Sequence, residues 1–230
     1  MPDPARPPSS RALAHPVIVF DLDGTLSDPL EGIGRSINHA LTRFGYPERP
    51  LAALASCIGP PLDESFPLLT GRDDPAHMRE LVASYRERYA DVGYAENVVY
   101  EGVPAMLDTL RDHGAVLGVC TSKLPVFAER ILTHFGLRDR FSFVSGGDIG
   151  VHKWQQLAAL RAQALVDDDA VMVGDRAIDV DAAHRNALHA CGVRWGFGSL
   201  EELAAARPRY LCEAPGDIVA LLSRQGGHAG

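Results

Sequence analysis

The chain has 230 residues, of which 46% are hydrophobic and 23% charged, and this composition excludes a disordered, collagen-like or coiled-coil protein. The formal net charge of −8, without a cluster of basic residues, argues against a nucleic-acid polymer as partner. No apolar run is long enough to span a membrane, so we expect no membrane partner. Of the 22 basic residues only two are lysines, Lys123 and Lys153.

The four cysteines are scattered along the chain and form no CxxC pair. We therefore expect reduced core thiols and a reducing, cytoplasmic setting, not a disulfide framework or a zinc site. Residues 1–16 are rich in proline and serine and contain no apolar signal-peptide region, which predicts a disordered N-terminal tail. Residues 225–230 are predicted to be a flexible C-terminus.

Five short apolar runs without polar alternation are typical of strands that are covered on both faces. In chain order they are Val17–Phe20, Ala115–Cys120, Phe141–Val144, Ala170–Val173 and Leu188–Val193. The helical stretches that separate the later runs are Val103–His113, Val126–Phe135, Trp154–Leu165 and Ala177–Ala187. This alternation of strand and helix predicts an α/β fold with a doubly wound parallel sheet.

The interval from residue 29 to residue 99 differs because it is almost wholly helical. We expect helices over Leu30–Phe44, Leu62–Leu69 and Pro75–Tyr89, and no buried strand. An insertion after the first strand lies over the carboxyl ends of the strands, where open α/β sheets bind ligands. The sequence thus predicts a small helical cap at 29–99 on a core formed by 17–28 and 100–224.

Two carboxylates, Asp21 and Asp23, directly follow the first strand, with a Gly-Thr pair behind them. Residues two apart in an extended segment point the same way, so the two carboxylates lie side by side. Like charges this close need a neighbouring cation or a proton on one of them. A solvated turn would also use Asp and Gly. A calcium loop is excluded, because its sixth and twelfth positions hold Leu26 and Gly32.

Polar residues also stand near the ends of three later strands. Thr121 and Ser122 follow the second strand, Lys153 opens the helix after the third, and Asp175 and Asp179 follow the fourth. Each alone fits a helix cap, a surface charge or a turn residue. Together they bring carboxylates, hydroxyls and a cation to one edge of one sheet, which favours a common functional site.

Taken in order, these residues resemble the motifs of the haloacid dehalogenase superfamily of phosphohydrolases. The motifs are DLDGT at Asp21–Thr25, CTSK at Cys120–Lys123, Lys153, and GDRAID at Gly174–Asp179. Three further segments are similar to the phosphoglycolate phosphatase-like branch, which carries a helical cap: Ile58–Phe66, Tyr100–Val103 and Trp195–Leu203. The resemblance implies a Rossmann-like core and a phosphatase for a small phosphorylated metabolite.

The mechanism that the resemblance implies gives five residues direct roles. Asp21 would attack phosphorus and form an aspartyl-phosphate, and Asp23 would act first as general acid and then as general base. Mg²⁺ would be held by Asp21, by the backbone carbonyl of Asp23 and by Asp175, an all-oxygen set that suits this ion. Thr121 and Lys153 would bind the oxygens of the transferring phosphoryl group.

The resemblance also implies a fourth metal-site residue and a set of substrate contacts. Asp179 would bind the metal, or would orient Lys153 or a metal-bound water. The candidate substrate-binding residues are those beside the phosphoryl group and one loop of the cap: Gly24, Thr25, Ser122, Lys123, Gly59 and Pro60. The loop with Gly59 and Pro60 fits a plain interhelical turn almost equally well.

Three readings of the function remain open. The first is a Mg²⁺-dependent phosphomonoesterase, phosphoglycolate phosphatase-like or 5′-nucleotidase-like. The second is a phosphosugar mutase, against which Thr25 counts, because mutases of this superfamily commonly carry an apolar residue there. The third is a catalytically silent relative that binds a phosphorylated ligand or a partner protein. Asp23 argues against dehalogenation, since dehalogenases lack this second aspartate.

Overall fold

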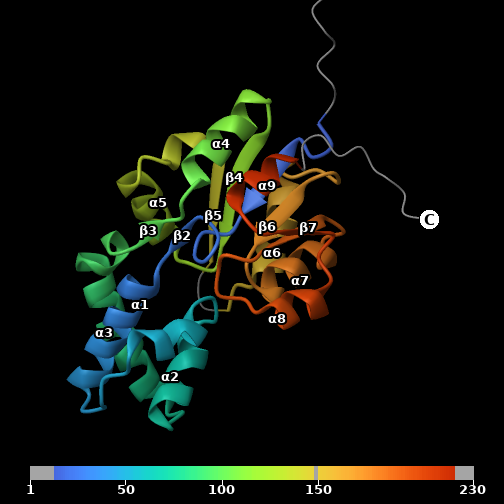
Figure 1. Ribbon diagram of the computed structural model, residues 1–230. Coiled ribbons are helices and arrows are strands. Elements are labelled where there is room, and N and C mark those ends of the chain that lie inside the picture. The colour runs from blue at the N-terminus through green and yellow to red at the C-terminus, as the bar shows by residue number, and fades with distance from the viewer. Residues whose placement is uncertain (1–12, 148–149, 221–230) are drawn as a thin grey trace, which may run out of the picture.

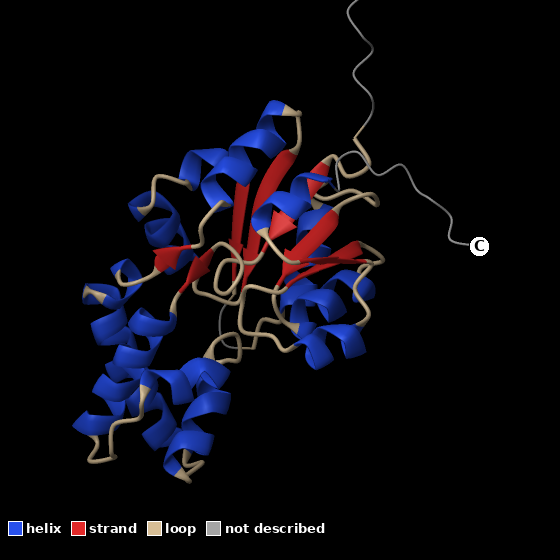
Figure 2. Cartoon of the chain, viewed as in Figure 1, coloured by secondary structure: helices blue, strands red, loops and turns tan. Residues whose placement is uncertain are grey.

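A six-stranded parallel sheet forms the centre of the computed structural model, which describes residues 13–147 and 150–220. The strand order is β5-β4-β1-β6-β7-β8, and the strands are drawn as red arrows in Figure 2. The bounds are Val17–Phe20 for β1, Val116–Thr121 for β4, Phe143–Gly146 for β5, Val171–Gly174 for β6, His189–Val193 for β7 and Tyr210–Cys212 for β8. The five expected strands are confirmed, and β8 is a sixth that the sequence did not predict.

Helices cover both faces of this sheet, as expected for a doubly wound fold (Figure 1). One face carries α4 (Val103–Asp112), α5 (Pro125–His134) and α9 (Pro215–Val219). The other carries α6 (Lys153–Ala162) and α7 (Ala177–Arg185), with α8 (Leu200–Ala206) beside α7. The 3₁₀ helix η3 (Arg138–Arg140) contacts α4 and α5.

The absence of polar alternation in β1 follows from this double cover. Ile18 and Phe20 point into the core under α4 and α5, whereas Val17 and Val19 point into the core under α6 and α7. Successive side chains of a strand face opposite sides, so a strand with a core on each side must be apolar throughout.

The interval between β1 and α4 forms the cap, which lies beyond the carboxyl ends of the strands (Figure 1). Its elements are α1 (Leu30–Arg43), η1 (Leu51–Cys57), α2 (Leu62–Thr70), α3 (Pro75–Asp91) and η2 (Gly93–Ala95). The three predicted helices are confirmed, and the hydrophobic cluster that packs them continues into the core under α4 and α5.

The expectation of an almost wholly helical interval misses one feature. Ser27–Asp28 (β2) and Val98–Val99 (β3) pair as a short antiparallel ribbon where the chain enters and leaves the cap. Each strand has only two residues, too few to show a periodic pattern, and the pair forms between segments that are far apart in the sequence.

All four cysteines are buried, and Sγ of Cys191 lies 3.5 Å from Sγ of Cys212. No helix in the described ranges is long and apolar enough to cross a membrane. Three segments lie outside the described ranges: most of the predicted N-terminal tail, the predicted flexible C-terminus, and residues 148–149 of the loop before Lys153.

We expect Gly118→Ala to lower the free energy of unfolding by about 1–3 kcal/mol, the usual cost of overpacking a core. Gly118 of β4 pairs with Phe143 of β5, and a Cβ at this position would lie 2.1 Å from Cζ of that ring. Urea unfolding followed by circular dichroism measures the change. Gly216→Ala is the matched control, since a Cβ there meets nothing within 4 Å. Equal stability of the two variants would contradict the close contact between Gly118 and Phe143.

Candidate active site

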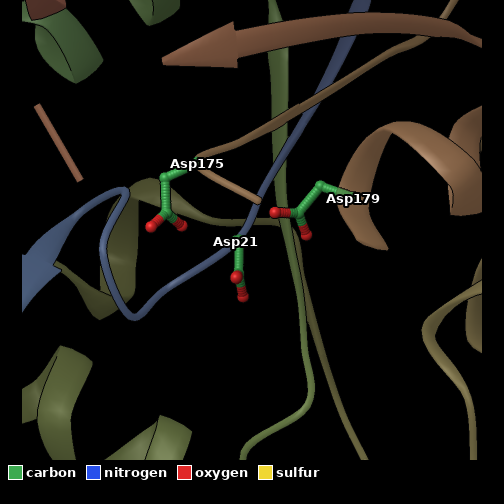
Figure 3. A group of neighbouring side chains, drawn as sticks. All are labelled: Asp21, Asp175 and Asp179. Carbon is green, nitrogen blue, oxygen red and sulfur yellow. The ribbon is translucent and has the colours of Figure 1, made fainter. Parts of the chain in front are cut away.

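The predicted site residues converge at the carboxyl ends of the central strands. Asp21 follows β1, Thr121 ends β4, Asp175 follows β6, and Lys153 begins α6. Carboxylate oxygens of Asp21, Asp175 and Asp179 all lie within 4.8 Å of one another, and all three residues are buried. Figure 3 shows the three carboxylates arranged around one small space. The grouping predicted from strand ends is thus the one observed.

Hydrogen bonds of the backbone fix the loop that carries Asp21. Its N–H donates to the carbonyl of Val173 at 2.8 Å, which extends the pairing of β1 with β6, and its Oδ1 accepts from the N–H of Leu22 at 2.8 Å. Gly24 then turns the chain at a φ of +79°, and a Cβ there would lie 2.2 Å from Oδ2 of Asp175. Only glycine combines this backbone conformation with so close an approach to a carboxylate.

Lys153 supplies the cation that neighbouring carboxylates require. Its ammonium lies 2.9 Å from Oδ2 of Asp21 and donates to Oδ1 of Asp179, and the residue is only 2% exposed. Burial alone would lower the pKa of this ammonium, but the charges of Asp179 and Asp21 outweigh it, so the pKa is raised above the usual lysine value. Lys153 therefore carries a full positive charge at neutral pH.

Asp175 is held by two donors from different parts of the chain. The hydroxyl of Thr25 donates to Oδ1 at 3.3 Å, and the backbone N–H of Phe197 donates to Oδ2 at 2.8 Å. Burial, with the nearby charges of Asp179 and Asp21, raises the pKa of Asp175 to about 8. The charge of Lys153 opposes this increase in the pKa but does not cancel it.

Asp179 uses both of its carboxylate oxygens within the protein. Oδ1 accepts from Lys153, and Oδ2 accepts from the backbone N–H of Arg176 at 3.0 Å, at the start of α7. Burial raises the pKa of Asp179 although the charge of Lys153 lowers it. These contacts support the role of orienting Lys153, and they leave Asp179 beside any ion that Asp21 and Asp175 hold.

Asp23 lies next to the second lysine of the chain. Its Oδ2 is 2.9 Å from the Nζ of Lys123, and its buried Oδ1 has no hydrogen-bond partner in the described structure. Burial raises the pKa of the Asp23 carboxyl, and the charge of Lys123 opposes this shift. Lys123 therefore does more than border the site, because it contacts one of the two motif aspartates directly.

A cavity of about 280 Å³ opens between this cluster and the cap. Asp21, Asp23 and Lys153 line its floor together with Thr121, Ser122 and Lys123. The cap contributes Gly59 and Pro60, so the loop that fits either a simple turn or a substrate contact does face the cavity. Further cap residues along the wall are Ile33, Cys57, Pro61, Leu62, Asp63, Glu64, Val82, Tyr85, Arg86 and Tyr89.

Several residues of the site were not predicted from the sequence. Gln156 is buried, and its Nε2 donates to the carbonyl of Thr121 at 3.1 Å. Arg176 donates from NH1 to the carbonyl of Ile58 at 2.6 Å, which ties the cap loop to the core. Gln156 stands three positions after Lys153 on the same helix face, a spacing that could have indicated it. Phe197 contributes only its backbone N–H, and the identity of a residue in the sequence does not indicate that its backbone forms part of a site.

The donor set fits a hard divalent cation. If all are ionised, the four aspartates and two lysines of the cluster (Asp21, Asp23, Asp175, Asp179, Lys123 and Lys153) leave an excess of two negative charges. The raised pKa of Asp175 and the unpartnered Oδ1 of Asp23 are signs of this uncompensated charge. Carboxylate and carbonyl oxygens are the ligands that Mg²⁺ prefers.

The haloacid dehalogenase-like hydrolase family matches residues 18–193, which include every candidate catalytic and metal-site residue. The chain belongs to this family. The Rossmann-like core and the helical cap agree with this membership.

Individual relatives of the family agree over most of the chain. A 5′-nucleotidase of Pseudomonas aeruginosa is 42% identical over 91% of this chain and 95% of the relative. A phosphoglycolate phosphatase of Synechococcus elongatus is 32% identical over 88% of this chain and 94% of the relative. The solved structure of protein tyrosine kinase A (PtkA) of Mycobacterium tuberculosis superimposes with a TM-score of 0.79 at 31% identity, over 93% of this chain and 99% of the other. With family and site together, the chain is a phosphoric monoester hydrolase.

We expect Lys153→Arg to lower kcat by at least about 100-fold, the loss typical of a removed electrostatic contact. Formal charge is kept, but the planar guanidinium is larger than the ammonium and cannot occupy the buried space between Asp21 and Asp179 without displacing one of them. Phosphate release from saturating substrate measures the effect.

The reverse exchange on the same helix, Arg161→Lys, is the control for the lysine-to-arginine change. Arg161 contacts Asp168 and the carbonyl of Asn186, away from the cavity, so this variant keeps near-normal activity. Full activity of Lys153→Arg, with an unchanged melting temperature, would mean that the ammonium at this position has no role beyond its charge.

Proposed function

We propose that the protein is a Mg²⁺-dependent phosphatase that hydrolyses a small phosphomonoester through an aspartyl-phosphate on Asp21. The observation that carries the proposal is the buried cluster of Asp21, Lys153 and Asp175, of which Asp21 and Lys153 line the cavity. A carboxylate beside a fixed cation can attack phosphorus as a nucleophile while the cation stabilises the charge on the phosphoryl group. A protein that only binds a phosphorylated ligand needs no such nucleophile.

In the first half-reaction, a carboxylate oxygen of Asp21 forms a bond to phosphorus while the ester oxygen leaves. Lys153 and the hydroxyl of Thr121 bind the phosphoryl oxygens on which charge develops. Asp23 donates a proton to the departing oxygen, so that the alcohol leaves neutral. Asp21, Asp175 and the backbone carbonyl of Asp23 would hold Mg²⁺, which would supply further neutralisation of the phosphoryl charge.

In the second half-reaction, water attacks the aspartyl-phosphate. Asp23 takes the proton from this water, and inorganic phosphate leaves with Asp21 regenerated. Asp179 keeps Lys153 in place throughout, because its carboxylate is fixed by the N–H of Arg176. Thr25 and the N–H of Phe197 hold Asp175 in the same way.

The size of the cavity supports a small phosphorylated metabolite as substrate. About 280 Å³ admits a phosphorylated acid, sugar or nucleoside but no folded polymer. The similarity to a 5′-nucleotidase and to a phosphoglycolate phosphatase defines the first compounds to assay. A panel of phosphoglycolate, 5′-nucleotides and sugar phosphates, with release of inorganic phosphate as the readout, ranks them. Isomerised sugar phosphate without phosphate release would instead support a mutase.

We expect Asp21→Asn to abolish phosphate release while the fold is kept, because the amide is isosteric but is no nucleophile, and Lys153 keeps Asp179 as a partner. Circular dichroism and thermal unfolding test the fold. Asp73→Asn, an exposed position in the cap, is the matched control and retains activity. Normal turnover by Asp21→Asn would remove the nucleophile from the proposal.

We expect chelation of divalent cations to abolish activity and added Mg²⁺ to restore it. Mg²⁺ also raises the melting temperature of the wild type, because an ion that binds only the folded state stabilises it. In Asp175→Asn this stabilisation is weaker, since one ligand has lost its charge. Full activity after exhaustive chelation would exclude a divalent ion from the mechanism.

A further inference from the structure

The backbone of Lys123 is fixed within the core, independently of the cap. Its N–H donates to the hydroxyl of Thr121 at 3.3 Å, and its carbonyl accepts from the N–H of Gly147 at 2.9 Å. The side chain leaves this loop toward the cavity and is only 7% exposed. Its buried ammonium therefore depends on the partners that it finds there.

One of these partners belongs to the cap. The ammonium of Lys123 donates to the hydroxyl of Tyr89 on α3 at 2.8 Å and lies 4.4 Å from the centroid of the same ring. Burial raises the pKa of the Tyr89 hydroxyl well above its usual value, so it remains neutral and accepts this hydrogen bond. Ring and hydroxyl together hold the cation at one place.

Tyr89 is itself held between the cap and the core. Its ring stacks on Tyr85 of the same helix with a centroid distance of 5.4 Å and meets the edge of Phe127 on α5 at 5.1 Å. Next to this contact, Arg130 of α5 donates to the carbonyl of Ala90 at 2.8 Å. The position of Tyr89 therefore depends on the docking of α3 against α5.

The other partner of Lys123 is Asp23, at 2.9 Å from its Oδ2. Because Oδ1 of Asp23 has no hydrogen-bond partner among the described residues, the contact with Lys123 is the one that orients the carboxyl. A chain of contacts thus runs from the cap through Tyr89 and Lys123 to Asp23.

We propose that Tyr89 and Lys123 are positioning residues through which the docked cap orients the carboxyl of Asp23 for proton transfer to the leaving oxygen. The inference rests on the proposed function, in which Asp23 is the general acid. Asp23 can then donate its proton to the leaving group only while α3 lies against the core. The leaving group is therefore protonated only when the cap covers the cavity. Neither residue touches the phosphoryl group in this role.

The test compares two leaving groups, because only a poor one needs the proton. The substrates are p-nitrophenyl phosphate, whose phenolate leaves readily, and phosphoglycolate or adenosine 5′-monophosphate, whichever is hydrolysed faster. The measured quantity is kcat/KM, which reports the steps up to the first irreversible one and hence departure of the leaving group. Lys123→Met keeps the length of the side chain, and Tyr89→Phe keeps the ring but removes the hydroxyl.

We expect Lys123→Met to lower kcat/KM by about 100-fold for the alkyl ester and by less than about tenfold for the aryl ester. Tyr89→Phe shifts the ratio in the same direction by a smaller factor, since the ring still lies over the ammonium. Arg130→Met weakens the docking of α3 without removing Tyr89 or Lys123, so it shifts the ratio in the same direction as Tyr89→Phe. Arg161→Lys, away from the cavity, is the control and leaves the ratio unchanged.

Equal losses on both esters for Lys123→Met and Tyr89→Phe would overturn the inference and leave only a structural role. If Lys123→Met fails to fold, Tyr89→Phe decides, because it removes a single oxygen. No phosphate release by the Mg²⁺-loaded wild type from any of the three esters would instead overturn the proposed function, so the two failures are distinguishable.

Discussion

The structure of the site depends on one buried cation, the ammonium of Lys153 between Asp21 and Asp179. Burying the charge of a lysine costs several kcal/mol unless nearby carboxylates compensate the lost hydration. The carboxylates of Asp21 and Asp179 both lie at hydrogen-bond distance from the ammonium of Lys153. The contact joins the end of β1 to the first turns of α6 and α7. It also permits Asp21 and Asp179 to approach each other, since two bare carboxylates at this distance would repel.

Glycines give the carboxylates the space that this arrangement needs. A Cβ at Gly24 would lie 2.2 Å from Oδ2 of Asp175, and one at Gly174 would lie 2.1 Å from Cγ of Asp179. At Gly196 a Cβ would come within 2.3 Å of the Cβ of Asp175. Three separate segments therefore leave out a side chain so that the acidic groups can converge, which a purely structural sheet edge would not require.

The cap and the core contribute different parts of the chemistry. The core supplies the aspartates, the lysines and the threonine, whereas most of the remaining residues that line the cavity come from the cap. Polar contacts that join the parts include those of Arg176 with the carbonyl of Ile58, of Arg130 with the carbonyl of Ala90 and of Lys123 with the hydroxyl of Tyr89. The candidate catalytic residues therefore come from the core, and the cap supplies most of the surface around them.

The sequence by itself determined the sheet, the cap and the grouping of Asp21, Thr121, Lys153 and Asp175. Apolar runs and the residues that follow them are local signals, and parallel strands bring their carboxyl ends to one edge. Only the tertiary structure decided the β2–β3 ribbon, the sixth strand and the contact of Lys123 with Tyr89, which is 34 positions earlier. Such contacts arise from packing between distant segments, and no local pattern encodes the distance between them.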